Sequence, residues 1–201
     1  MDHKSASSPS TSLSLLERVR THDQEAWERL VYIYGPLVQH WCRKYRLQSQ
    51  DMDEQFQDVW GAVFERIGGF RREQDGDSFR GWLWTITRNK LCDRFRKMDQ
   101  QPQAVGGTDF RAVIEAMPDS EPADIAADGA SPLVENPAHR AARLIRSDFE
   151  EPTWRAFWAV AVEGRQPAEV ADDLGMKRDS VYQAKSRVLK RLREELDGLL
   201  D

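Results

Sequence analysis

Cysteine and histidine are scarce in this 201-residue chain, which has two cysteines and four histidines. Cys42 and Cys92 stand singly, outside any Cys-x-x-Cys pattern, and the histidines are scattered. Protein zinc sites need such residues clustered at short spacings. The sequence therefore predicts no metal site, and it predicts reduced, packed thiols of the kind found in the cytoplasm.

Long apolar runs and enzyme signatures are missing as well. No stretch approaches the roughly 18 apolar residues that cross a bilayer, and the Ser-rich residues 1–12 lack the apolar centre of a secretion signal. The chain has no Gly-rich phosphate loop, no His-Glu-x-x-His motif and no nucleophile elbow. We therefore expect a cytoplasmic protein that does not enter a membrane, uses no cofactor and is not an enzyme.

Charge is unevenly distributed along the chain, although the net charge is only −5. Residues 99–135 contain eight acidic residues and one basic residue, whereas residues 176–193 contain seven basic residues and one acidic residue. Prolines and glycines interrupt any helical period in the acidic stretch. This pattern is typical of a flexible linker between a basic binding unit and a separate domain.

Apolar residues recur with helical spacing on both sides of that linker, and no strand-like alternation of useful length occurs. The sequence thus predicts an all-α protein of two small helical domains. The expected division is a disordered tail at 1–12, a first domain at 13–98, a flexible acidic linker at 99–136 and a second domain at 137–201.

Residues 79–97 combine aromatic and basic side chains on one predicted helix. Phe79, Leu83 and Ile86 share one face, with Trp82 beside them. Guanidinium groups and ring planes together suit single-stranded nucleic acid, because phosphates attract charge and unstacked bases pack on rings. An ordinary amphipathic helix with a solvated basic face is the alternative. Of the two neighbouring tryptophans, we expect Trp84 to face nucleic acid and Trp82 to be buried.

The second domain reads as a helix-turn-helix. Pro167 opens a short helix, Gly175 ends it, and a longer basic helix follows. Arg and Gln side chains on such a helix read bases in the major groove, and Lys190 and Arg191 further along would hold phosphates. A helical hairpin with a solvated basic face is the alternative here.

Three blocks of the chain resemble bacterial sigma factors of the extracytoplasmic-function (ECF) type, in the sigma-70 family. They are residues 53–60 (DEQFQDVW), residues 79–96 (FRGWLWTITRN, then DRFR) and the helix-turn-helix at 167–187. The resemblance covers both domains in the expected order. Gln55 departs from it by standing where the family usually has Leu, and Lys177 replaces the usual Ser before the recognition helix.

This resemblance implies that sigma region 2 is the first domain and sigma region 4 the second. Region 2 would bind the β′ clamp helices of core RNA polymerase through Gln57, Asp58 and Trp60, and would capture and melt the promoter −10 element. The residues implied there are Arg71, Arg72, Arg80, Trp84, Arg88, Asn89, Arg94, Arg96 and Lys97. Region 4 would contact the β flap and read the −35 element through Arg178, Ser180, Tyr182, Gln183, Lys185, Ser186, Arg187, Lys190 and Arg191.

Other functions remain open at this point. A stand-alone helix-turn-helix regulator would bind duplex DNA without polymerase, usually as a dimer. A sigma-like inhibitory protein would sequester a partner, although the intact basic faces argue against it. The sequence does not say whether an anti-sigma factor is a further partner.

Overall fold

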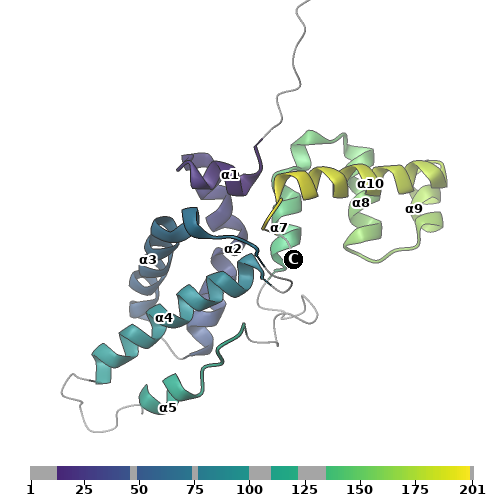
Figure 1. Cartoon of the computed structure of the whole chain (residues 1–201). Helices are drawn as coiled ribbons and strands as arrows, with labels where there is room; N and C mark the ends of the chain where they lie inside the picture. The colour runs from purple at the N-terminus through teal and green to yellow at the C-terminus, as the bar shows by residue number, and fades with distance from the viewer. Residues whose placement is uncertain (1–12, 46–48, 74–76, 100–109, 122–134, 200–201) are drawn as a thin grey trace, which may run out of the picture.

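The computed structural model describes residues 13–45, 49–73, 77–99, 110–121 and 135–199. Within these ranges all regular elements are helical, which confirms the all-α prediction. The helices are α1 (Leu15–Arg20), α2 (Gln24–Lys44), α3 (Ser49–Arg66), α4 (Phe79–Asp99), α5 (Phe110–Glu115), α7 (Pro137–Leu144), α8 (Glu151–Ala161), α9 (Pro167–Leu174) and α10 (Arg178–Glu195) (Figure 1). Short 3-10 turns follow α3 at Ile67–Gly69 and α7 at Arg146–Asp148. The predicted tail at 1–12 lies outside the described residues.

None of the helices in the described ranges is long and apolar enough to span a membrane.

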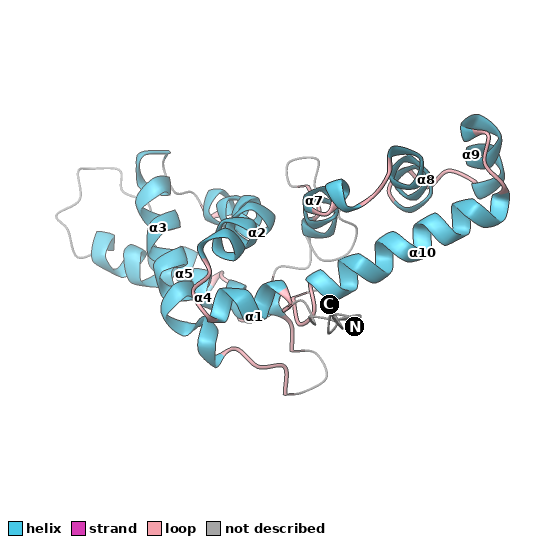
Figure 2. Ribbon diagram, turned by 90° about the horizontal axis from the view of Figure 1, so that it is seen from above, coloured by secondary structure: helices cyan, strands magenta, loops and turns pink. Residues whose placement is uncertain are grey.

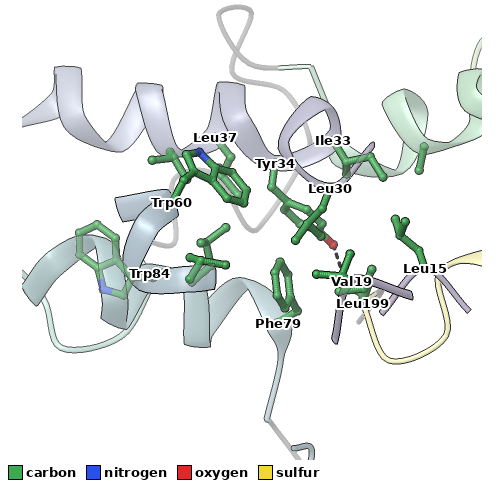
Figure 3. Close-up of a cluster of buried hydrophobic side chains, with 14 of the residues drawn as sticks. Leu15, Val19, Leu30, Ile33, Tyr34, Leu37, Trp60, Phe79, Trp84 and Leu199 are labelled. Carbon is green, nitrogen blue, oxygen red and sulfur yellow. Dashed lines mark hydrogen bonds between the residues drawn. The ribbon is translucent and has the colours of Figure 1, made fainter. Parts of the chain in front are cut away.

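Helices α1 to α4 pack around one apolar core. The Asp23 carboxylate starts α2 by accepting a hydrogen bond of 2.8 Å from the Ala26 amide. Apolar residues at helical spacing on α2, among them Leu30 and Tyr34, are fully buried (Figure 3). The Tyr34 ring packs against Phe79 of α4 at 4.8 Å between centroids. At the far end of α3, Gly68 and Gly69 fall in the 3-10 turn that follows the helix.

Residues 110–121 of the acidic linker are structured, which corrects the prediction of a flexible segment for this part of it. Helix α5 forms within it and packs against α4. Met117, just after α5, is 4% exposed and belongs to the same apolar core as α4. The prediction failed because the apolar pattern of Val113, Ile114 and Met117 is too short to indicate a helix among the surrounding acids, prolines and glycines.

Helices α8, α9 and α10 form the predicted helix-turn-helix. Pro167 is the first residue of α9, and Gly175 ends it in the left-handed conformation at φ 62°, which costs glycine little. Val170, Val181 and Ala184 bring the three helices together in a small core of their own. Lys177 precedes α10 without a side-chain capping bond, so the cap that Ser usually supplies is missing.

The two halves of the chain are in contact. The C-terminal end of α10 and the residues after it pack beside α1 and α2, while its N-terminal end extends away to α9 (Figure 2). Leu196 and Leu199 are buried in the same core as Leu15 and Leu30. Helix α7 also packs on α2, where the Arg140 guanidinium donates to the Tyr32 carbonyl at 2.7 Å. The two predicted domains thus share an interface that the sequence did not indicate.

Candidate nucleic-acid and polymerase interface

The three residues predicted to bind polymerase do not share one environment. Gln57 and Asp58 are exposed on α3. Trp60 is 5% exposed, and its ring packs edge-on against Trp27 at 5.7 Å between centroids. The prediction of Trp60 as a contact residue is therefore wrong, because its side chain is part of the core. Gln57 and Asp58 remain available to a partner.

The assignment of the two tryptophans on α4 is reversed. Trp84 is fully buried, with its ring 5.3 Å from Trp41 and 5.8 Å from Tyr45 between centroids. Trp82 is half-buried beside Phe70, at 5.2 Å. Trp84 was expected to face nucleic acid, which its burial contradicts. Trp82 is the tryptophan of α4 that is only half-buried. Sequence reasoning missed it because Trp82 also lies next to the apolar face of the helix.

Two predicted DNA-binding arginines have roles within the fold. Arg94 bridges α4 to α3 through Asp51 at 2.7 Å and Glu54 at 3.0 Å. Burial lowers the pKa of Arg94, but the hydrogen bonds and charges of Glu54 and Asp51 outweigh burial and raise it. Arg71 donates to the Gly68 carbonyl at 2.7 Å and to the Phe70 carbonyl at 2.8 Å, so its guanidinium braces the turn after α3.

Exposed polar and basic side chains remain over the last three turns of α4. Asn89, Arg96 and Lys97 are exposed there, and Arg72 is exposed in the turn before the helix. Arg96 pairs with Asp93 at 3.1 Å, but both side chains are largely solvated, so the pair is weak. A hollow between α3 and α4 joins Arg96 and Lys97 to Asp58. The candidate surfaces for DNA and polymerase are thus adjacent.

Arg80 and Arg88, also predicted to bind DNA, face the linker. The Arg80 Nε atom donates to Glu121 at 3.0 Å, and the Arg88 guanidinium lies 2.8 Å from the Asp119 carboxylate. Sequence reasoning missed this contact between two acids and two arginines. The acidic charge of the linker indicated that it would contact basic residues. Which arginines of α4 it contacts depends on the fold and could not be predicted from the sequence.

Most of the residues of α10 that were predicted to read DNA are exposed. Arg178, Tyr182, Gln183, Ser186, Arg187 and Lys190 are exposed, and Ser180 and Lys185 are half-buried. Val181, Ala184 and Val188 occupy the opposite, buried face. The Arg178 guanidinium lies over the Tyr182 ring at 5.7 Å. This packing orders two long side chains at the N-terminal end of the helix.

Arg191 differs from the other cations of α10. It pairs with Asp148 at 3.0 Å and with Glu195 at 2.9 Å. Burial lowers the pKa of Arg191, and Glu195 and Asp148 more than offset that effect and raise it. Because both carboxylates already use its donors, this arginine is poorly placed to hold a phosphate.

Cys42 is a packed thiol of the apolar core. Burial raises the pKa of Cys42 to about 12, so the side chain stays protonated at neutral pH. A thiolate is the form that binds metals and attacks electrophiles, and Cys42 does not provide it under those conditions.

Comparison with known proteins gives a family assignment for the first half of the chain. The family model of sigma-70 region 2 matches residues 30–101. The solved structure of CnrH in complex with the cytosolic domain of CnrY is similar over 91% of this chain and 95% of that one, at 19% sequence identity and a TM-score of 0.35. No curated protein matches the chain. Residues 30–101, which include α2 from Leu30 onward, α3 and α4, therefore match sigma-70 region 2.

Proposed function

We propose that the protein is an ECF-type sigma factor that binds core RNA polymerase and directs it to promoters with a −10 and a −35 element. One observation carries the proposal: a sigma-70 region 2 and a helix-turn-helix with an exposed basic recognition face occur in the same chain. A stand-alone regulator, which acts without polymerase, would not need a sigma-70 region 2.

In this proposal α3 provides the polymerase contact. Gln57 and Asp58 are exposed and point away from the core that Trp60 joins. The β′ clamp helices would dock there. The neighbouring hollow, which also includes Lys90 and Lys97 of α4, would place the melted −10 strand beside the polymerase.

Capture of the −10 strand falls to α4 and the turn before it. Arg72, Asn89, Arg96 and Lys97 supply donors and positive charge, and the Trp82 ring supplies a surface on which an unstacked base packs. The protein does no covalent chemistry in this step. It stabilises the open strand, so that melting becomes less unfavourable.

Recognition of the −35 element falls to α10. Arg178, Gln183 and Arg187 are exposed along the face that enters the major groove, where Arg pairs with guanine and Gln with adenine. Lys190 lies one turn further on and contacts phosphate, which fixes register without reading sequence.

The two halves must separate for both elements to be bound. Helix α10 has 18 residues, so its recognition end lies within about 27 Å of the end that packs on α1 and α2. Elements about 25 base pairs apart are roughly 85 Å apart along a duplex with a rise of about 3.4 Å per base pair. The packed arrangement therefore represents the free protein, and promoter binding requires the α10 contact to open.

Charge reversal on α3 tests the polymerase contact. Asp58→Arg should abolish co-elution with core RNA polymerase in gel filtration, with the helical circular dichroism signal retained. Asp53→Arg is the matched control, because Asp53 is also exposed but lies about 140° away around the helix. Equal loss in both variants, or retention in both, contradicts the docking site. If the wild-type protein does not co-elute with core polymerase but binds duplex DNA as a dimer, the protein is a stand-alone regulator.

A further inference from the structure

Residues 110–121 of the linker lie against α4, which is the helix that carries most of the candidate −10 residues. Val113 and Ile114 pack against the main core, and Met117 is buried in it. This anchoring gives the acidic residues that follow a fixed position on α4. We refer to residues 117–121 as the strap.

Three polar contacts join the strap to α4. The Trp84 indole N–H donates to the Pro118 carbonyl at 3.2 Å, Arg88 lies 2.8 Å from Asp119, and Arg80 donates to Glu121 at 3.0 Å through Nε. A second guanidinium nitrogen of Arg80 also bonds the same Glu121 oxygen. Each contact uses a donor that the resemblance to sigma factors assigned to DNA.

The two ion pairs differ in how firmly they hold the strap. Arg80 and Glu121 have side chains only 17% and 13% exposed, so solvent screens this pair weakly and a phosphate does not reach the arginine while the pair is intact. Asp119 is 95% exposed, and its pair with Arg88 is open to competition by salt and by water. Glu121 is therefore the main electrostatic contact.

We propose that the strap is a built-in competitor of single-stranded DNA. Its carboxylates occupy guanidinium donors that DNA phosphates would otherwise take, so the strand binds only the fraction of molecules in which the strap has lifted. The measured dissociation constant then equals the intrinsic one divided by that fraction. The inference rests on the proposed function, since it requires α4 to be the DNA surface.

Neutralising the two strap carboxylates tests this. In the full-length chain, Glu121→Gln alone and combined with Asp119→Asn remove charge while preserving side-chain size. The control is Glu115→Gln, which makes the same charge change on the exposed side of α5, where Glu115 forms no ion pair with the described residues. The probe is a fluorescent 20-nucleotide single strand of mixed sequence, followed by anisotropy. Deuterium exchange at the backbone amides of residues 112–117 is measured in the absence of DNA and reports whether the strap has lifted from α4.

The strap account predicts faster exchange at residues 112–117 in the double variant and affinity for the strand raised about three- to tenfold, with Glu115→Gln unchanged in both. Faster exchange with wild-type affinity overturns the inference and leaves the proposed function standing. Unchanged exchange in the double variant overturns it too, because the ion pairs then do not hold the strap. An equal gain in affinity for the strand in Glu115→Gln assigns the effect to the net charge of the protein and also overturns the inference. Absence of strand binding by every protein refutes the DNA role of α4 itself, and the inference with it.

Discussion

The Tyr34 hydroxyl donates a hydrogen bond of 2.6 Å to the carbonyl oxygen of Leu199, 165 residues away in sequence and fully inside the protein (Figure 3). The bond joins α2 to the segment that follows α10. Arg29 supports it by pairing with Glu195 at 3.1 Å. Gly198 allows the close approach: a Cβ there would lie 2.9 Å from a methyl group of Leu16. The contact is thus a specific interface.

Tyr34→Phe should weaken this interface. The change removes the donor and leaves the buried Leu199 carbonyl without its partner, which costs about 1–3 kcal/mol. Urea denaturation followed by circular dichroism measures the loss. Tyr32→Phe is the control, since the Tyr32 hydroxyl makes no hydrogen bond within the described residues and its ring contact with Arg140 is kept. Equal stability of both variants would show that the Tyr34 bond contributes little.

Gln55→Leu should stabilise the protein. Gln55 is fully buried, and neither its amide nitrogen nor its amide oxygen has a hydrogen-bond partner within the described residues. Restoring the leucine usual in the family removes this desolvation penalty, for a gain of about 1–3 kcal/mol in the free energy of unfolding. Gln57→Leu, on the exposed side of the same helix, should change it little. A destabilised Gln55→Leu protein would indicate that the amide is satisfied in solution.

Trp82→Ala and Trp84→Ala should separate function from stability. Trp84 is fully buried, so its removal should cost about 3–5 kcal/mol and lower the thermal midpoint strongly. Trp82 is half-buried, so its removal should leave the fold intact and reduce promoter opening. Permanganate reactivity of unpaired thymines, measured with core polymerase, reports opening. The reverse pattern, with a stable Trp84→Ala protein defective in opening, would restore the original assignment of Trp84.

Lys190→Ala should weaken binding to duplex DNA and reduce its salt dependence. Each phosphate contact releases condensed counterions, so losing one should lower the slope of log affinity against log salt by about 1. Arg165→Ala is the control, because Arg165 lies outside α10 and its guanidinium pairs with Asp173. Titration of a 30-base-pair duplex of mixed sequence at several salt concentrations gives both slopes. Identical slopes in wild type and Lys190→Ala would remove Lys190 from the interface.

Periodicity and turn signals were enough to predict the all-α class and the helix-turn-helix, but not α5. The Pro167 and Gly175 boundaries of α9 appear where local chemistry places them. Burial of Phe79, Leu83 and Ile86 also followed from spacing. These features depend on neighbours a few residues away, which sequence displays directly.

Long-range packing was not predictable in the same way. Trp60 was assigned to a binding surface by the resemblance to sigma factors, and Trp84 because Trp82 was placed on the buried face. Both complete the core against α2. The pairing of Arg80 with Glu121 and the bond from Tyr34 to Leu199 join segments whose approach depends on the whole fold. Sequence indicated the charges involved but not their partners.

Run-off transcription with core RNA polymerase is the most direct test of the central claim, that this chain is a promoter-specificity subunit. Genomic DNA fragments serve as templates, and the 5′ ends of the transcripts are mapped. The account predicts discrete start sites that depend on added protein and share upstream −10 and −35 sequences. Folded protein that yields no start sites beyond those of core polymerase alone would contradict it.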